Sequence, residues 1–219
     1  MNFASELAKD RAAALTLVRV SHETESRLDL FVNLFLRWQS AVQLVAKSTL
    51  GKLWTRHIAD SLQLIDIAPD ARVWVDLGSG GGFPGLMIAI AIADRPGALV
   101  HLIESDTRKA AFLREAARVT RAPVQIQAER IESVAERIGQ VDVVVARALA
   151  PMTGCLQLAA PFLAAGSTGI FLKGQDVDNE LTQAAKSWSS QYTVRQSLTD
   201  PGGRIVIINS AAPRPVTKC

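Results

Sequence analysis

The stretch RVWVDLGSGGGFPG, from Arg72 to Gly85, decides the fold of this chain. An apolar run ends at Asp76, and four glycines follow at positions 78, 80, 82 and 85. Because glycine has no Cβ, a ligand can lie directly against the backbone of such a loop. The apolar residues Leu86 to Ala93 then predict a helix that covers a sheet and directs its free N–H groups at the loop. A ligand-binding loop between a strand and a helix is therefore predicted, with a purely structural turn as the alternative.

The position of the glycines favours one cofactor class over another. Counted from Gly80, the loop matches the spacing of a dinucleotide-binding fingerprint. A pyrophosphate site, however, needs its first glycine directly after the strand, which is Gly78, and Phe83 then replaces the third glycine. Pro84 also has no N–H to donate. Counted from Asp76, the pattern D-x-G-x-G-x-G resembles the first motif of class I S-adenosylmethionine (AdoMet) methyltransferases. Backbone N–H groups suit the carboxylate of that ligand, and a nearby acid suits its positive groups.

Composition indicates an ordinary globular protein with one catalytic domain, since 48% of the 219 residues are apolar and 21% are charged. Glu6 and Asp10 lie where a signal peptide is basic and then apolar, and no apolar run is long enough to cross a bilayer. Cys155 and Cys219 have no metal-ligand spacing and form no disulfide framework. We therefore expect a cytoplasmic protein with neither a metal ion nor a membrane partner.

The net charge of +3 is only mildly basic, but the basic residues are unevenly distributed. Residues 30–59 contain no acid, and the bases there, interleaved with two tryptophans, are Arg37, Lys47, Lys52, Arg56 and His57. After Asp200 the charged residues are again all basic: Arg204, Arg214 and Lys218. The two segments could form one phosphate-attracting face. A scatter of solvated basic side chains explains the pattern equally well.

Residues 1–70 are predicted to form a helical extension that packs on a catalytic domain of residues 71–219. Apolar residues recur every three or four positions between Leu28 and Val42, which places them on one helix face. Ser21, followed by Glu23 and Glu25, indicates where this helix begins. From Arg72 onward, strand-like and helix-like runs alternate, a pattern typical of a parallel sheet covered on both faces.

We expect seven strands, at Val73–Leu77, Leu99–Glu104, Val124–Ala128, Val141–Ala146, Gly169–Leu172, Tyr192–Ser197 and Ile205–Asn209. The helices expected between them are Leu86–Ala93, Thr107–Val119, Ile131–Ile138, Met152–Leu163 and Val177–Trp188. Between the last two strands, Asp200 to Gly203 leave room only for a tight turn, which predicts an antiparallel hairpin. The predicted fold is therefore α/β: a Rossmann-like, seven-stranded class I methyltransferase sheet with its last strand antiparallel.

Further motifs resemble one family, RsmG (also called GidB), the bacterial 16S ribosomal RNA guanine-N7 methyltransferases. Besides Trp38, Leu44 and the glycine loop, the motifs are RHIADSL (Arg56 to Leu62), LIES (Leu102 to Ser105), ARALAP (Ala146 to Pro151) and FLKGQ (Phe171 to Gln175). Their order and spacing carry a resemblance that spans most of the chain. It implies 16S rRNA (guanine(527)-N(7))-methyltransferase activity, AdoMet as cofactor with S-adenosylhomocysteine as product, and rRNA of a small subunit or assembly intermediate as partner.

The predicted cofactor site combines this resemblance with the sheet pattern. The resemblance implies that Gly78 and Phe83 contact AdoMet, that Ile131 and Glu132 lie on its adenine side, and that Arg147 is the cofactor-site arginine. Glu104 ends a predicted strand, where a carboxylate can bind ribose hydroxyls; a capping or surface acid is the alternative. The full predicted set is Asp76, Gly78, Gly80, Gly82, Phe83, Glu104, Ile131, Glu132 and Arg147.

Methylation of guanine N7 needs no base, because N7 already offers a lone pair, so alignment and the local field can carry catalysis. The chain lacks the Asn-Pro-Pro-Tyr motif of amine methylation and the Pro-Cys nucleophile of pyrimidine-carbon methylation. We hypothesise that Arg147 and Lys173 are the catalytic residues, positioning phosphate or guanine atoms; a surface role for Lys173 is the alternative. The predicted RNA-binding residues are Lys47, Lys52, Arg56, His57, Lys173 and Arg204.

Two positions depart from the family pattern, because Gln43 and Val45 stand where relatives usually have asparagine and threonine. Three other functions stay open at this point. A small-molecule AdoMet methyltransferase would share the fold and make no use of the basic segments. A nicotinamide oxidoreductase would bind NAD at the loop, and a binding module would hold AdoMet without turnover.

Overall fold

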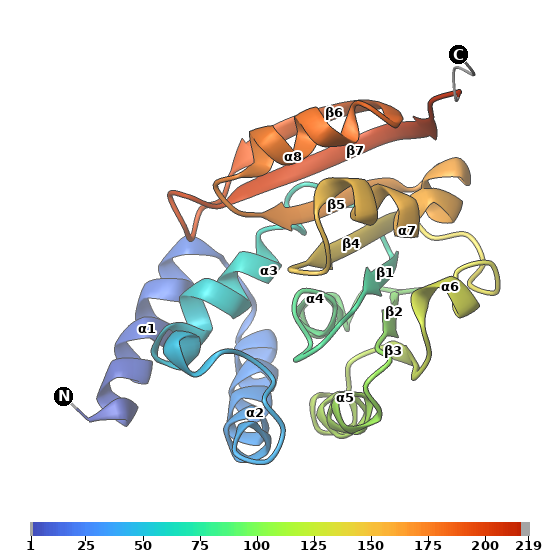
Figure 1. The fold of residues 1–219 in the computed structure, drawn as a ribbon. Helices are drawn as coiled ribbons and strands as arrows, with labels where there is room; N and C mark the ends of the chain where they lie inside the picture. Colours follow the sequence, from blue (N-terminus) through green and yellow to red (C-terminus); the bar gives the residue numbers. More distant parts are fainter. Residues whose placement is uncertain (1, 216–219) are drawn as a thin grey trace.

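A computed structural model describes residues 2–215 of the protein; Lys218 and Cys219 lie outside them (Figure 1). Its centre is one seven-stranded sheet in the order β3-β2-β1-β4-β5-β7-β6. The strands are β1 (Val73–Leu77), β2 (Leu99–Ile103), β3 (Val124–Gln127), β4 (Val143–Arg147), β5 (Thr168–Lys173), β6 (Trp188–Gln196) and β7 (Arg204–Pro213). All seven predicted strands are therefore confirmed, with shifted ends.

Strands β1 to β5 are parallel where they pair, and β7 is antiparallel to both β5 and β6. The predicted terminal hairpin is thus confirmed. The strand order reverses between β1 and β4, which lie side by side in the middle of the sheet. In open α/β sheets, ligands bind at this reversal, beyond the carboxyl ends of the strands.

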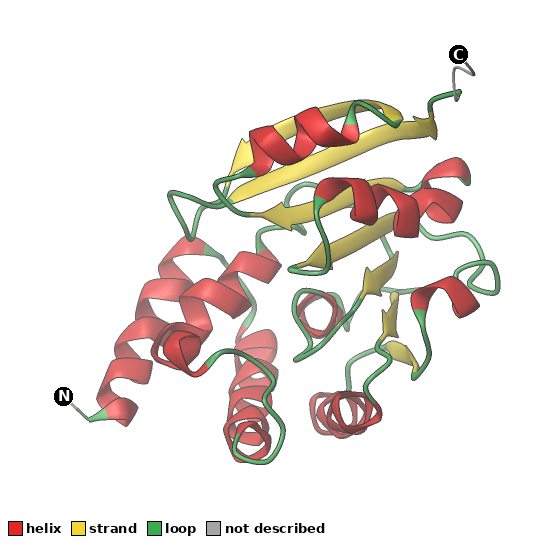
Figure 2. Ribbon diagram, viewed as in Figure 1, coloured by secondary structure: helices red, strands yellow, loops and turns green. Residues whose placement is uncertain are grey.

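Helices cover both faces of the sheet (Figure 2). They are α4 (Gly85–Ala91), α5 (Thr107–Thr120), α6 (Ile131–Val134), α7 (Met152–Ala164) and α8 (Val177–Ala184). Successive β4 residues alternate between two apolar cores, since Val143 and Val145 pack with α4 and α5 whereas Val144 and Ala146 pack with α6 and α7. The near-continuous apolar strands follow from burial on both faces.

The N-terminal region consists of α1 (Phe3–Leu17), α2 (His22–Gln39), the 3₁₀ turn η1 (Lys47–Lys52), the π-helical turn η2 (Trp54–Ala59) and α3 (Asp60–Leu62). Ser21 begins α2 as predicted, because its side chain accepts a hydrogen bond from Thr24 N at 3.1 Å. Phe31 and Phe35 of α2 belong to the same core as α4 and α5. The division at residue 70 stays a prediction.

A buried carboxylate joins α1 to the turn that follows η1. Asp10 accepts hydrogen bonds from Trp54 N at 2.7 Å and from Thr55 N at 3.3 Å. These N–H groups open η2 and have no partner within that turn, so the side chain of another helix satisfies them. Burial raises the pKa of Asp10 above its usual value, although the two N–H groups lower it.

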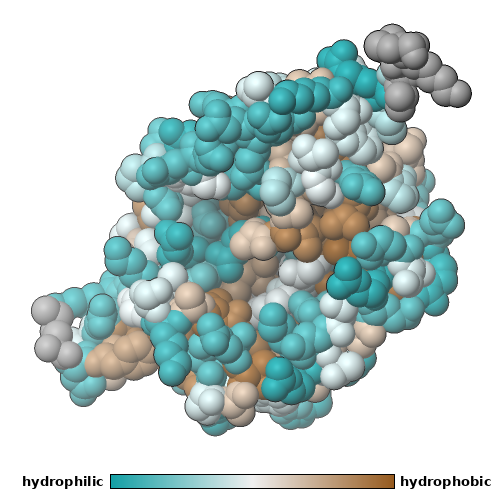
Figure 3. All heavy atoms as spheres, in the orientation of Figure 1, coloured by the Kyte–Doolittle hydropathy of each residue, from teal (hydrophilic) through white to brown (hydrophobic). Residues whose placement is uncertain are grey.

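Two predicted helices are shorter in the structure. The α-helical part of Ile131–Ile138 ends at Val134, and Val177–Trp188 ends at Ala184. Trp188 instead opens β6, which pairs with β7 up to Pro213. Strand β6 is an edge strand with a mostly exposed, hydrophilic outer surface, visible along the top of Figure 3. The length of β6 follows from its pairing with β7 and not from an alternation of apolar residues. The sequence pattern therefore missed the first half of this strand.

Candidate functional site

The loop between β1 and α4 has a backbone that requires glycine. Gly78, Gly80 and Gly82 have φ angles of +75°, +52° and +90°, which side chains rarely adopt. Strand β2 holds the loop in place, because Gly78 N and Ser79 N both donate to Ile103 O, at 3.0 and 2.9 Å. A Cβ on Gly78 would lie 2.8 Å from the side chain of Leu149. The absence of a Cβ at Gly78 therefore allows Leu149, in the segment that follows β4, to pack against the loop.

Asp76 lies behind this loop and does not reach its ligand side. Its side chain is fully buried, and Oδ2 accepts a hydrogen bond from Gly85 N at 3.0 Å. Oδ1 has no hydrogen-bond partner within residues 2–215. Burial raises the pKa of this carboxyl to about 7. Asp76 accepts the first free N–H of α4, which therefore does not point at a ligand. The ligand contact of Asp76 stays a prediction.

Glu104 follows β2 and fixes the other side of the loop. Its Oε2 accepts a hydrogen bond from Gly80 N, and its Oε1 accepts one from Asp106 N, both at 2.8 Å. Glu104 is nearly buried, yet it still lines the cavity beside the loop. The acid predicted at this strand end therefore stabilises the loop and lies on the wall of the cavity.

A cavity of about 510 Å³ opens beside the glycine loop, and we call it the loop cavity. Seven of the nine predicted cofactor residues line it together: Gly78, Gly80, Phe83, Glu104, Ile131, Glu132 and Arg147. The exceptions are Asp76 and Gly82; Gly82 packs against Leu86 and Leu113. The volume is that of a site for a small organic ligand.

Arg147, at the end of β4, is held in one orientation by three groups. Its Nη2 donates to His57 Nδ1 at 2.7 Å, and its Nη1 donates to Arg56 O at 3.2 Å. The guanidinium carbon lies 5.1 Å from the centre of the Phe83 ring, a cation–π contact. Burial lowers the pKa of Arg147, whereas the charges of Asp60 and Asp76 raise it.

His57 is a buried partner of Arg147. Its Nδ1 accepts from Arg147, so Nε2 carries the proton and donates to Thr49 Oγ1 at 2.9 Å. Thr49 in turn donates to Ala46 O at 2.8 Å. Burial and the charges of Arg147 and Arg56 lower the pKa of His57 to about 3, so the ring is neutral. His57 lines the basic side of the site, where its ring orients Arg147, and its RNA contact stays a prediction.

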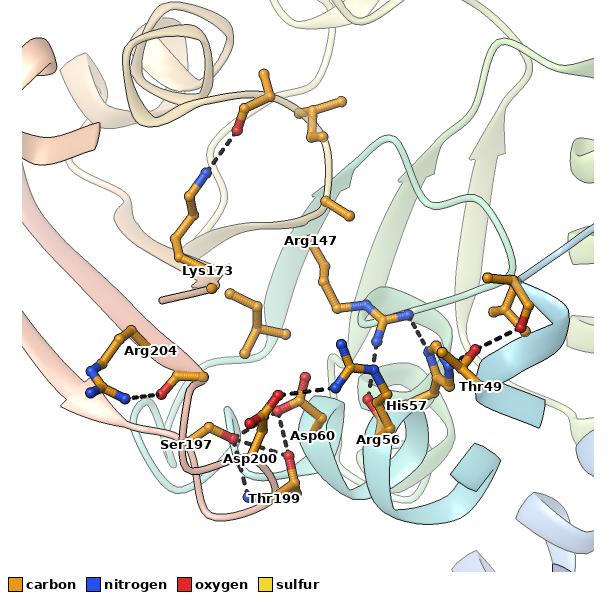
Figure 4. Close-up of a pocket in the computed structure, with 18 of the residues that line it drawn as sticks. Thr49, Arg56, His57, Asp60, Arg147, Lys173, Ser197, Thr199, Asp200 and Arg204 are labelled. Atoms are coloured by element: carbon orange, nitrogen blue, oxygen red, sulfur yellow. Dashed lines mark hydrogen bonds and ion pairs between the residues drawn. The ribbon is translucent and has the colours of Figure 1, made fainter. Parts of the chain in front are cut away.

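A second cavity, of about 650 Å³, lies next to the first, and we call it the basic cavity. Figure 4 shows Arg56, Arg147, Lys173 and Arg204 around it. The two cavities share one wall, formed by Leu44, Arg147, Ala148 and Leu149. A group in the loop cavity and a group in the basic cavity can therefore approach each other at this wall.

The predicted RNA-binding residues fall into different environments. Arg56 is half exposed and donates to Asp200 Oδ2 at 3.0 Å, and Arg204 donates to two backbone carbonyls of its own turn. Lys47 and Lys52 are exposed on η1, outside the residues that line either cavity. The positive face predicted from the charge pattern therefore includes side chains at the cavity mouth and others beyond it.

Lys173 differs from the predicted substrate-facing lysine. Only 9% of its side chain is exposed, and its Nζ lies 2.5 Å from Glu180 Oε2 and 2.8 Å from Ala150 O. Glu180 also accepts a hydrogen bond from Met152 N at 2.7 Å. Lys173 thus stabilises the segment 148–151 at the shared wall, and its charge is already paired.

Sequence reasoning missed one group that lines the basic cavity. Asp60 accepts hydrogen bonds from Ser197, Thr199 and Gln63, which joins the end of η2 to the turn between β6 and β7. The RHIADSL motif contains Asp60, but spacing alone gave it no partner. Its partners lie about 140 residues further along the chain, as their separations of 137 and 139 residues show.

Parallel strands that end in an antiparallel hairpin, together with the glycine loop after β1 and the acid after β2, define a class I AdoMet-dependent methyltransferase fold. Solved structures agree. The O-methyltransferase from Bacillus cereus, in complex with SAH, matches with a TM-score of 0.60 at 14% identity, over 95% of this chain and 100% of that one. Rv0187 from MTB, which is cofactor-bound, matches with a TM-score of 0.58 at 12% identity, over 93% and 96%.

Sequence comparison defines the family within this class. The family model GidB, described as rRNA small subunit methyltransferase G, matches residues 24–205. The Ribosomal RNA small subunit methyltransferase G of Bradyrhizobium sp. (strain ORS 278) is 54% identical over 206 residues, which cover 94% of this chain and 93% of the relative. That of Rhodopseudomonas palustris (strain BisB18) is 51% identical over 210 residues, or 95% and 90%. This chain belongs to the GidB family of small-subunit rRNA methyltransferases.

Two further properties of residues 2–215 bear on the earlier expectations. None of their helices combines the length and the apolar composition that crossing a membrane requires. Within the same residues, no three His, Cys, Asp or Glu side chains are grouped so that they could hold a metal ion.

Proposed function

We propose that this protein transfers the methyl group of AdoMet to N7 of a guanine in 16S rRNA, the base numbered 527 in the family's substrate. The observation that carries this proposal is the wall shared by the loop cavity and the basic cavity, at Arg147 and Leu149. A methyl donor on one side of this wall and a base on the other can align for an in-line displacement, and such alignment supplies much of the catalysis.

The loop cavity fits AdoMet on two observations. Gly80 has a φ of +52°, and a Cβ there would come no nearer than 3.8 Å to Gly78 O, so the space beside it is open and a ligand can lie against the backbone. Glu104 and Glu132 both line the cavity, and their carboxylates suit ribose hydroxyls and the adenine amino group, respectively. When bound, AdoMet supplies an electrophilic methyl group. The N–H groups of Gly78, Ser79 and Gly80 already have partners, so side chains contribute more of the recognition than the glycine pattern predicts.

The basic cavity suits a nucleophile that needs no deprotonation. His57 is the nearest basic group to Arg147, but both of its nitrogens are engaged in hydrogen bonds and its pKa is depressed to about 3. It therefore orients Arg147 and does not act as a base. Guanine N7 presents a lone pair without a proton, which matches a cavity built for positioning. Arg147, whose orientation is fixed, positions guanine or phosphate atoms relative to the methyl donor.

We assign the phosphate contacts to Arg56, Arg204, Lys47 and Lys52, with an rRNA segment in a small subunit or an assembly intermediate as the partner. Arg56 and Arg204 line the basic cavity, and the two lysines extend the positive surface beyond it. Phosphate contacts of this kind position a nucleic acid without reading its sequence. The reaction needs no metal ion in this scheme, and we place the protein in the cytoplasm with its substrate.

Transfer of tritiated methyl groups to undermethylated small subunits, followed by mapping of the modified nucleotide, tests the proposal. We expect one labelled guanine, with the label at N7. A small-molecule methyltransferase is the second candidate because the loop cavity fits AdoMet whatever the acceptor is; it predicts unlabelled rRNA. Titration with AdoMet and NAD separately tests the cofactor, and we expect heat of binding with AdoMet alone.

A further inference from the structure

Asp60 has two carboxylate oxygens in very different environments. Oδ1 accepts three hydrogen bonds, from Gln63 Nε2 at 2.7 Å, Thr199 Oγ1 at 2.7 Å and Ser197 Oγ at 2.9 Å. Oδ2 accepts no hydrogen bond from any group in residues 2–215. The three donors to Oδ1 fix the plane of the carboxylate. An acceptor with one unused oxygen is thus held in a fixed orientation.

The unused oxygen belongs to the basic cavity. Asp60 lines that cavity and not the loop cavity, and Figure 4 shows it on the cavity wall beside Arg56 and Asp200. Asp200 makes a useful contrast, because its Oδ1 accepts from Gly202 N at 2.9 Å and its Oδ2 accepts from Arg56 at 3.0 Å. Of these two neighbouring carboxylates, only that of Asp60 has an oxygen left for a ligand.

An acceptor oxygen that has no protein donor can select for a particular base. Guanine carries two kinds of N–H donor, at N1 and N2, on the side of the ring system away from N7, whereas adenine has an acceptor at N1. A guanine whose N7 faces the shared wall therefore directs its donors into the basic cavity, where Asp60 lies. Arginine donors on the same cavity suit the guanine O6 acceptor.

We infer that Asp60 is a specificity-determining residue, whose Oδ2 accepts a hydrogen bond from N1–H or N2–H of the target guanine. This inference rests on the proposed function and assigns base recognition within it. A site that hydrogen-bonds one base rejects a base that leaves the buried group unpaired. Asp60 thereby distinguishes guanine from adenine, which also offers an N7 lone pair to a methyl donor.

The test combines one variant with two modified bases in a double-mutant cycle. In Asp60→Asn, the amide oxygen keeps the three donors to Oδ1, so the amide NH₂ faces the cavity and opposes the guanine N–H. Small subunits are reconstituted with guanosine, inosine or 2-aminopurine riboside at the target. Inosine lacks the N2 amino group, and 2-aminopurine lacks N1–H and O6. We expect the variant to lose about tenfold or more of kcat/KM on guanosine, with AdoMet affinity unchanged.

The coupling between variant and base decides the assignment. We expect kcat/KM of the wild type to be about tenfold or more lower on at least one modified base than on guanosine. The corresponding decrease for Asp60→Asn on that same base should be much smaller. Asp200→Asn, the matched control, should lose the same factor on all three bases. Equal losses of kcat/KM for wild type and Asp60→Asn on both modified bases would overturn the inference. A wild type that is insensitive to both modified bases would also overturn it, and this measurement does not depend on the variant folding. If the wild type leaves guanosine unmethylated, the proposed function itself has failed.

Discussion

The loop cavity and the basic cavity share a wall but are built in different ways. The loop cavity comes from backbone: three glycines with positive φ, tied to β2 through Ile103 O and Glu104. The basic cavity comes from side chains of four segments, around residues 44–60, 147–151, 172–180 and 197–204, which are joined to one another by hydrogen bonds. The comparison teaches that a fixed backbone can serve the cofactor side, whereas the substrate side depends on long-range pairing of side chains.

Substitution of Arg147, which is one of the residues that line both cavities, is expected to have the largest effect and tests this comparison most strongly. In Arg147→Ala we expect kcat/KM for rRNA methylation to fall by about 100-fold to 1,000-fold, because the group that aligns guanine or phosphate atoms with the methyl donor is lost. Arg147→Lys keeps the charge but loses the planar fork that reaches both His57 and Arg56 O, so it should restore only part of the activity. Steady-state kinetics with small subunits measures both. Activity of Arg147→Ala above a tenth of wild type would show that the shared wall does not carry catalysis.

A second test uses ionic strength to distinguish the role of the basic cavity from that of the loop cavity. Substitution of Lys47, Lys52 and Arg56 by alanine together should weaken rRNA binding by about tenfold to a hundredfold at physiological salt. The slope of log affinity against log salt should fall by about 2 to 3, since each lost phosphate contact removes less than one unit. Filter binding over a salt series gives both quantities, and AdoMet titration is the control. An unchanged slope would favour the small-molecule methyltransferase.

A pair of glycine substitutions tests the backbone side of the comparison. Gly78→Ala forces a side chain into a φ of +75°, which costs about 1–2 kcal/mol of unfolding free energy. The nearby Leu149 side chain can move aside, so the backbone strain dominates. Gly174→Ala is the matched control on the basic cavity, since a Cβ there meets no atom within 4 Å. Denaturant unfolding should show a loss for Gly78→Ala alone; equal losses would contradict the proposed division.

The smallest expected effect concerns pH. The pKa of His57 is about 3 in the folded protein, below the unfolded value of 6.5, so its contribution to stability is complete above pH 6.5 and falls as the pH drops towards 3. Between pH 8 and pH 6 the loss is about 1 kcal/mol. His57→Asn should flatten this part of the stability curve. Thermal unfolding across that pH range, compared with wild type, would detect it, and parallel curves would rule out a neutral buried His57.

The sequence predicts the loop cavity well because its signals are local. The run ending at Asp76, the glycines after it and the acid at Glu104 lie within two successive strand–loop units, and seven of the nine predicted residues meet in the cavity. Asp76 lies outside this set because Gly85, nine residues later, donates its N–H to the carboxylate, which is buried behind the loop. A spacing pattern cannot distinguish a ligand contact from such an internal bond.

The basic cavity was predicted less well, for a physical reason that is the same at each residue. Lys173 does end a strand at the ligand edge, but Glu180 neutralises it. His57 does neighbour the site, but Arg147, ninety residues away, holds it inside. Asp60 was missed because its partners lie beyond the last helix. The role of each charged group here depends on its partner in the folded structure, and the local sequence does not show which partner that is.

The carboxylate of Asp10 connects the first helix to the turn that carries two residues of the functional site. Asp10 lies outside residues 24–205, the span common to the family pattern, yet it anchors the start of the turn that carries Arg56 and His57. A version of this chain trimmed to the shared span would keep every recognisable motif and lose that anchor. Its sequence motifs would still identify the family, but the turn that orients the Arg147 guanidinium would have lost its anchor. Truncated forms should therefore be judged by measured turnover and not by sequence similarity.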